Sequence, residues 1–246
     1  MKIYDVEQGT EEWLALRLGI PTASNFDQII TPGGDLSASS RKYMARLLAE
    51  RLLNESMEAP LDTLEHIERG RLDESDAVHA FEFENDCETV RLGFITTDDG
   101  RWGASLDRAF IGGILEVKCP SPQVHLQYYM DGFGKSYRVQ VQGQLLVATK
   151  DGLDIDEAVR WSFNRRLPPV LTRTPRDKAF IAKMRSHLDR FSDELDEHER
   201  TLRAAGYFEA RAQVVSAIEQ AYGLDGSLAD YTVTGPGELP DTRMAG

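Results

Sequence analysis

The sequence has few of the features that mark secreted or membrane proteins. Among its 246 residues only Cys87 and Cys119 are cysteines, too few for a disulfide framework. No apolar run approaches the roughly 20 residues that a membrane-spanning helix requires. The first residues, 1–5, lack the apolar core of a secretion signal. We therefore expect a soluble protein of a reducing, cytoplasmic compartment.

Basic residues are also scarce relative to acidic ones. The chain has 28 Lys and Arg against 41 Asp and Glu, a formal net charge of −13. This balance excludes proteins that coat nucleic acid through their overall charge. Any contact with DNA must be confined to a channel or pocket whose local charge differs from the average.

The length suits one domain with a full hydrophobic core. We expect that domain to span residues 1–223. Residues 224–246 are rich in Gly, Pro, Asp and Thr, and this composition predicts a disordered tail.

The apolar residues recur at two different periods along the chain. A three- to four-residue period predicts helices at residues 10–18, from an N-cap at Ser24, through Tyr43 and Leu47, at 65–84, around Gln140, from Thr174-Pro175 onward, and through Val214, Ile218 and Tyr222 to Gly223. A strand-like pattern of β-branched and aromatic residues predicts strands within 92–119 and at 158–163. The expected fold is mixed α/β.

A hairpin is predicted where two adjacent glycines, 112–113, separate two strand-like runs. With these glycines as the turn, Ala109 lies opposite Glu116 and Asp107 lies opposite Lys118. The three charged side chains then share one face of the sheet. The small side chain of Ala109 would leave room beside Glu116 for a hydrated ion.

Such a cluster admits two interpretations. Two carboxylates held close together repel each other unless a cation lies between them, and oxygen ligands suit Mg²⁺ or Mn²⁺. The ion would activate water on a phosphodiester, and Lys118 would orient that water. Alternatively, Asp107 and Lys118 form only a cross-strand ion pair worth about 0.2–1 kcal/mol. The spacing alone leaves the two interpretations equal.

Two further polar residues fall on apolar helical patterns. Glu74 lies on the apolar stripe of the helix at 65–84, where burial would be costly without a partner such as a metal. If the stripe is rotated by one position, Glu74 is simply solvated. Gln140 lies between Val139 and Val141, and could either bind phosphate or cap a strand.

Several short motifs together resemble one protein family. They are Val6-Glu7-Gln8-Gly9 with Trp13, Arg17-Leu18-Gly19, Thr22-Ala23-Ser24, Ser105-Leu106-Asp107, Leu115-Glu116-Val117-Lys118-Cys119-Pro120 and Gln140-Val141-Gln142. Their order and spacing resemble the phage lambda exonuclease or YqaJ-like viral recombinase family, within the PD-(D/E)xK nuclease superfamily. The similarity runs from about Val6 to about Gly206.

The resemblance implies a restriction-endonuclease-like core, a central mixed sheet flanked by helices. It implies a Mg²⁺-dependent 5′-to-3′ exonuclease with two ions, for which Mn²⁺ can substitute. The enzyme would hydrolyse one strand of linear double-stranded DNA and leave a 3′ overhang for single-strand annealing recombination. The implied partners are DNA ends, a single-strand annealing protein and, in a homotrimeric ring, further copies of the chain. A phage or prophage origin is also implied, in a bacterial or phage-infected cell.

The resemblance also assigns roles to individual residues. It implies that the metal ligands are Asp107, Glu116, the Val117 carbonyl and, for a second ion, Glu74. It implies that Lys118 orients the attacking water and that Gln140 supports Lys118. It also implies a 5′-phosphate pocket formed by Arg17, Ser24 and Ser105. From the residues themselves, Ser24 at a helix N-terminus is an anion site and Arg17 a bidentate donor. The alternatives are an ordinary N-cap serine and a surface arginine.

The chain departs from the family pattern at two places. Leu106 replaces the proline of the superfamily motif, a position that only shapes the backbone. The arginine expected soon after Lys118 is absent, and the segment 121–125 offers only His125 in its place. The competing functions are a structure-specific or restriction-like endonuclease on the same core and a non-catalytic DNA-binding protein.

Overall fold

The computed structural model describes residues 1–57, 64–134, 136–149, 155–206, 216–218 and 220–222. The chain divides into two compact units, Met1–Glu199 and Arg200–Gly246. In the second unit, residues 216–218 and 220–222 are helical, as predicted, while Val214 and the expected tail lie outside the described residues. The fold and the site described below belong to the first unit.

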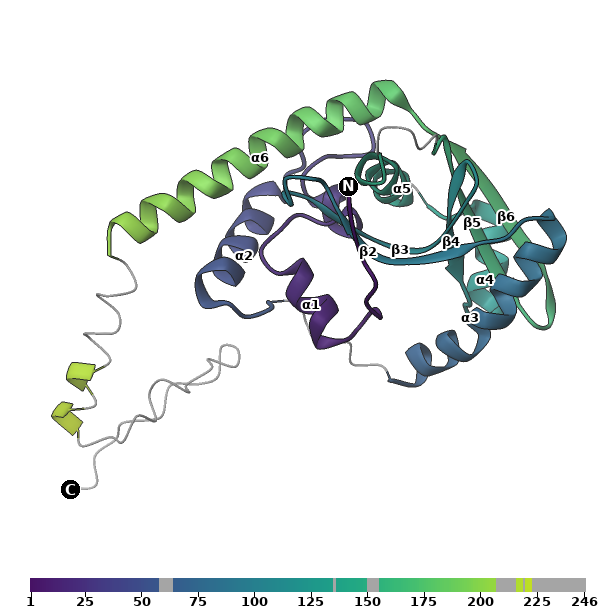
Figure 1. Cartoon of the computed structure of the whole chain (residues 1–246), viewed down its shortest axis with the longest axis horizontal. Coiled ribbons are helices and arrows are strands. Elements are labelled where there is room, and N and C mark those ends of the chain that lie inside the picture. The colour runs from purple at the N-terminus through teal and green to yellow at the C-terminus, as the bar shows by residue number, and fades with distance from the viewer. Residues whose placement is uncertain (58–63, 135, 150–154, 207–215, 219, 223–246) are drawn as a thin grey trace. The chain divides into compact units, whose positions relative to one another are not determined.

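A six-stranded sheet forms the centre of the first unit (Figure 1). Its strands follow one another in chain order: β1 (Lys2–Tyr4), β2 (Val90–Thr96), β3 (Gly103–Phe110), β4 (Gly113–Lys118), β5 (Glu157–Asn164) and β6 (Leu167–Pro175). Strands β4 and β5 pair in parallel, and the other neighbours pair antiparallel. The predicted mixed α/β fold is therefore confirmed.

Helices cover both faces of the sheet (Figure 1). They are α1 (Glu11–Arg17), the 3₁₀ helix η1 (Ala23–Gln28), α2 (Ser40–Leu53), α3 (Leu64–Asn85), α4 (Pro122–Asp131), α5 (Ser136–Val147) and α6 (Lys178–Ala204). One hydrophobic core lies between the sheet and η1, α2, α5 and α6. A smaller core lies between α3 and the opposite face of β4 and β5.

Strand β4 shows why the sequence specifies this layering. Ile114 packs into the larger core, whereas Leu115 and Val117 pack into the smaller one. Side chains alternate between the two faces of a strand, so a strand with apolar residues at successive positions has an apolar side chain on each face. Such a strand is stable only where other elements pack against both faces of the sheet. The strand that carries Glu116 and Lys118 is thereby held rigidly in the middle of the sheet.

Most predicted helices are confirmed, but the predicted start of the long helix α6, at Thr174-Pro175, was wrong. Thr10 caps α1 by accepting the Trp13 N–H at 3.3 Å, as expected. Residues 174–175 do not open α6, because they continue β6 opposite β5. The helix begins at Lys178, after Asp177 has accepted the Phe180 N–H at 2.9 Å.

The predicted hairpin register was also wrong. Phe110 pairs with Gly113 and Ala109 pairs with Ile114, so the turn is formed by residues 111–112. Ala109 therefore does not face Glu116, and regular pairing ends at Arg108 and Leu115, so Asp107 is not paired with Lys118. The reason is packing: a Cβ at Gly113 would lie 2.3 Å from the Phe110 ring, so this glycine accommodates an aromatic neighbour within the strand.

Both cysteines are free thiols. Burial raises the pKa of Cys119 to about 12 and also raises that of Cys87, so both thiols stay neutral near pH 7. Among the described residues, no helix has the length and apolar character needed to span a membrane.

Helix α5 packs unusually close to η1, and a mutation tests this contact. In a helix interior alanine is favoured over glycine by about 1 kcal/mol. At Gly143, however, a Cβ would lie 2.5 Å from the ring of Phe26, which is fully buried. We expect Gly143→Ala to lower the free energy of unfolding by about 1–3 kcal/mol, measured by urea denaturation.

The double variant Gly143→Ala/Phe26→Leu provides the control. A smaller side chain at residue 26 should make the alanine less destabilising than it is beside phenylalanine. Equal effects of Gly143→Ala in both backgrounds would show that the contact with Phe26 is not the cause.

Candidate active site

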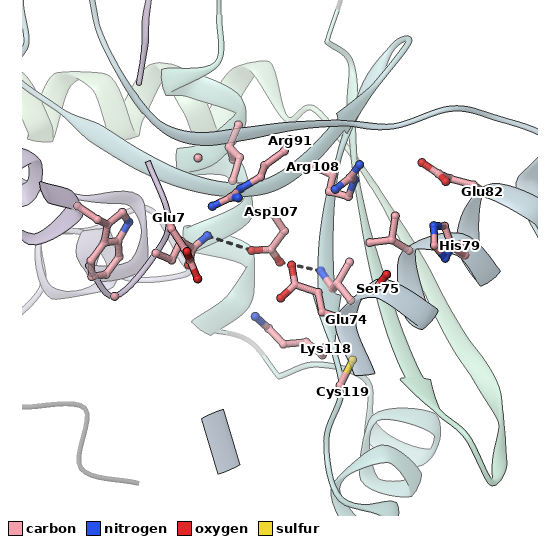
Figure 2. Close-up of a pocket in the computed structure, with 17 residues that line it drawn as sticks. Glu7, Glu74, Ser75, His79, Glu82, Arg91, Asp107, Arg108, Lys118 and Cys119 are labelled. Carbon is pink, nitrogen blue, oxygen red and sulfur yellow. Dashed lines mark hydrogen bonds between the residues drawn. The ribbon is translucent and has the colours of Figure 1, made fainter. Parts of the chain in front are cut away.

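A cleft of about 700 Å³ opens where the N-terminal segment, α3 and strands β2 to β4 meet. Four of the predicted site residues line it: Glu74, Asp107, Val117 and Lys118. Figure 2 shows Glu74, Asp107 and Lys118 converging on its centre from three different elements. Residues far apart in the sequence are thus brought to one surface.

Asp107 lies where strands β3 and β4 stop pairing. Its Oδ2 accepts the Val117 N–H at 2.8 Å, and its Oδ1 accepts a hydrogen bond from Gln8 Nε2 at 3.2 Å. The carboxylate thus takes the place of a main-chain acceptor on the neighbouring strand. Two donors from different segments fix its orientation. Gln8, which belongs to the N-terminal motif, was not predicted as a site residue.

The surroundings of Asp107 disfavour its negative charge. Burial raises its pKa to about 7, and the carboxylates of Glu116 and Glu74 act in the same direction. The ammonium of Lys118 and the Val117 N–H oppose this rise. A divalent cation beside Asp107 would offset the repulsion among the carboxylates.

Glu116 lies beside the cleft rather than in its lining, and it is buried. Its Oε1 accepts hydrogen bonds from Lys118 Nζ at 2.6 Å and from Gln140 Nε2 at 3.3 Å. Its Oε2 accepts one from Gln144 Nε2 at 2.8 Å. Helix α5 therefore fixes Glu116 from behind, through Gln140 and Gln144.

Gln144 is a site residue that the sequence analysis missed. The same amide group also donates to the Ser105 carbonyl at 3.2 Å, so it joins Glu116 to strand β3. The available signal was its position one helical turn after Gln140, which places both side chains on one face of α5. Gln142, between them, points elsewhere and binds the Pro175 carbonyl and the Asp177 N–H.

Lys118 forms its ion pair with Glu116, two residues away on the same strand. Burial opposes the charge on Lys118, but Glu116 and Asp107 outweigh it and raise the pKa of the ammonium above its ordinary value. Lys118 is therefore a cation and hydrogen-bond donor near pH 7.

Glu74 is exposed on α3, so of the two alternatives the stripe rotated by one position is correct and the buried position is not. The buried positions of the stripe are Ala77, Val78 and Phe81. Glu74 instead faces the cleft, where its charge contributes to the raised pKa of Asp107. Its charge therefore stays solvated when no ligand is bound.

The donors around the cleft suit a hard divalent cation. No group of three His, Cys, Asp or Glu side chains in the described parts of the chain is close enough to enclose a metal ion. What the site offers is two interacting carboxylates, Asp107 and Glu116, beside a main-chain segment at Val117. Oxygen-only sets with few protein ligands are typical of Mg²⁺, which retains water.

Arg17 and Ser105 meet beside the cleft. The Ser105 hydroxyl accepts Trp13 Nε1–H at 2.9 Å and lies 3.5 Å from Arg17 Nη1. The Arg17 guanidinium stacks 4.2 Å above the Trp13 ring. Two of the three predicted phosphate-pocket residues are thus brought together, and the stacking fixes the orientation of the arginine.

The third, Ser24, does not cap a helix as predicted. The segment is the six-residue 3₁₀ helix η1, and its N-cap is Thr22. The Ser24 side chain is exposed, with its hydroxyl 3.2 Å from that of Thr22. The serine follows the start of the helix because Thr22 is held by the Tyr43 hydroxyl and a bridge to Gly103.

His125 cannot substitute for the arginine missing after Lys118. It is buried on α4, with Nδ1 2.8 Å from the Ser162 hydroxyl and Nε2 2.9 Å from the Pro168 carbonyl. Both ring nitrogens therefore join α4 to strands β5 and β6.

Comparison with known proteins gave one family and several similar structures. The model of the YqaJ-like viral recombinase domain matches residues 12–151. The alkaline exonuclease of Laribacter hongkongensis is 28% identical, with a TM-score of 0.68 over 80% of this chain and 98% of that chain.

The same exonuclease in complex with dAMP gives a TM-score of 0.67 at 28% identity, over 81% of this chain and 100% of that chain. A phage-related exonuclease from Haemophilus somnus is 13% identical, with a TM-score of 0.54 over 73% of this chain and 96% of that chain, and shares the fold. No curated protein matched.

The contact between Gln144 and Glu116 can be tested through metal binding. Gln144→Met keeps the length of the side chain but removes both hydrogen bonds. Loss of a residue that orients a metal ligand typically weakens metal binding about 10–100-fold. We expect a loss of this size for Mn²⁺, measured by calorimetry. Gln127→Met, at an exposed position on α4, should bind Mn²⁺ like the wild type. Equal affinities for the two variants would contradict the role of Gln144.

Proposed function

Because the chain belongs to the YqaJ-like viral recombinase family and is a nuclease that acts on DNA, we propose that it is a Mg²⁺-dependent 5′-to-3′ exonuclease. It would hydrolyse one strand of linear duplex DNA and leave a 3′ overhang. The observation that carries the proposal is the position of Asp107, held between β3 and β4 beside Lys118 in an open cleft.

In this proposal the carboxylates hold the metal. Asp107 and Glu116 would be ligands, together with the Val117 carbonyl, and Glu74 would contact a second ion from α3. When bound, the metal would activate water and stabilise negative charge on the phosphate. Gln140 and Gln144 keep Glu116 in one orientation, so little reorganisation is required on binding.

Lys118 would act on the water and the phosphate. Its ammonium lines the cleft and is held at 2.6 Å by Glu116. From there it can orient the attacking water by hydrogen bonding and stabilise the charge that develops on the phosphate. Gln140, which shares the same oxygen of Glu116, would support this arrangement.

The polarity would come from recognition of the terminal phosphate. The Arg17–Ser105 pair offers a guanidinium and a hydroxyl near the cleft, and the exposed hydroxyl of Ser24 would complete the pocket. Ser105 precedes Asp107 by two residues on β3, so a phosphate bound at Ser105 places the next linkage near Asp107. The segment 121–125 after Lys118 adds no arginine to this pocket. The preference for a 5′-phosphate end over a 5′-hydroxyl end should therefore be modest.

The proposed partners follow from the charge and the family. An acidic chain can hold DNA only where its basic groups gather, and a homotrimeric ring would collect them around one channel. The 3′ overhang would be passed to a single-strand annealing protein. DNA ends, rather than internal sites, would be the substrate.

End-labelled linear duplex tests the activity and its polarity. With Mg²⁺, the protein should release nucleotides from 5′ ends and leave a supercoiled circle intact. EDTA should abolish release, as should Asp107→Asn, which keeps the shape of the side chain but removes its charge. Cleavage of the circle would favour the restriction-like endonuclease, and release from 3′ ends would contradict the proposed polarity.

Arg17→Ala tests the phosphate pocket. It removes an interaction that only phosphorylated ends make, so kcat/KM should fall about tenfold on 5′-phosphate ends, equivalent to about 1.4 kcal/mol, and much less on 5′-hydroxyl ends. Both substrates must share one sequence and one salt concentration. Equal slowing of both ends would mean that Arg17 is a structural residue or a general backbone contact.

A further inference from the structure

Two arginines on the cleft wall lie directly opposite each other. Arg91 on β2 pairs with Arg108 on β3, and both line the cleft that contains Asp107. In Figure 2 both guanidinium groups lie on the same side of Asp107, away from Glu74 and Lys118. Like charges opposed on adjacent strands destabilise a sheet, so this pair requires an explanation.

The hydrogen-bond partners of the two guanidinium groups are neutral. Arg91 donates to the Val6 carbonyl at 3.3 Å, and Arg108 donates to the hydroxyl and carbonyl of Thr89. In the described part of the chain, neither forms an ion pair with a carboxylate. Many other arginines do, among them Arg51, Arg101, Arg138, Arg165 and Arg173. In a chain of net charge −13, two opposed arginines without such a partner indicate an anion from outside.

Glu82 is a carboxylate that lines the same cleft and interacts electrostatically with Arg108. Its Oε1 accepts both the N–H and the hydroxyl of Thr89, and these bonds, more than Arg108, lower its pKa. Thr89 therefore lies between the two charges. Arg108 is oriented by Thr89 and keeps its charge available to the cleft.

The position along β3 indicates which anion. A strand advances about 3.3 Å per residue, so Ser105, Asp107 and Arg108 span about 10 Å. One DNA strand presents a phosphate about every 3.4 Å of helix axis, so three consecutive phosphates span about 7 Å of axis and fit within this length of β3. On the proposed function, Ser105 meets the terminal phosphate and Asp107 the scissile one. Arg108 and Arg91 then face the phosphate that follows.

We propose that Arg91 and Arg108 bind the backbone phosphate one linkage beyond the scissile phosphate on the degraded strand. This inference rests on the proposed 5′-to-3′ activity. A phosphodiester between two guanidinium groups relieves their repulsion and accepts bidentate hydrogen bonds. The contact holds the strand in register after each nucleotide is removed.

Neutralising one linkage at a time tests the proposal. The substrate is a 5′-phosphorylated duplex with a methylphosphonate at the second or the sixth internucleotide linkage, and the readout is the single-turnover rate of the first cleavage. For the wild type, neutralising the second linkage should lower this rate about tenfold, and neutralising the sixth should not. Arg91→Ala/Arg108→Gln should be slow on the unmodified duplex and show no further loss at the second linkage.

Arg166→Ala is the matched control, because it removes one charge from an exposed position in the β5–β6 turn. In this variant, a methylphosphonate at the second linkage should lower the rate of the first cleavage as much as it does in the wild type. The single variant Arg91→Ala, at an exposed position, guards against misfolding of the double variant and should lose part of the sensitivity.

Two failures are distinguishable. If the wild type releases nucleotides from 5′ ends but the arginine variants respond to the second linkage as it does, the arginine site is wrong and the proposed function stands. If the wild type releases nothing from the 5′ end of the unmodified duplex, the proposed polarity is wrong and the assignment of this phosphate fails with it.

Discussion

The hydrogen bond from the Val117 N–H to the Asp107 carboxylate is the interaction on which the rest of the site depends. A side chain replaces a main-chain acceptor, so β3 and β4 remain linked where their regular pairing ends. This separation of the two strands places the Val117 main chain beside the Asp107 carboxylate. The same separation opens the cleft and brings Lys118 to its wall.

Helix α5 connects the parts of the site. Its glutamines at 140 and 144 hold Glu116, and the second also binds strand β3 at Ser105. On its other side, Gly143 allows η1 to approach closely through Phe26. Glu116 and Ser105 of the proposed phosphate pocket are therefore both positioned by one helix, and a shift of α5 would move both together.

The sequence predicted the fold class and the gathering of Asp107, Glu116 and Lys118, because alternation within a strand and local motifs carry that information. It did not predict the register, because Gly113 fits beside an aromatic ring rather than in a turn. Arg91 and Gln144 were missed because their neighbours in space are distant in sequence. The sequence could not show that His125 is buried, because the groups on β5 and β6 that bind its ring are about 40 residues away in the chain.

The two edges of the sheet differ from its centre. Strand β1 is only three residues long, and β6 contains Pro168, Pro169 and Pro175, which have no N–H to donate to another strand. Neither edge favours extension of the sheet by a neighbouring molecule. The sheet is therefore protected at both edges from the strand-to-strand aggregation that a long, regular edge invites.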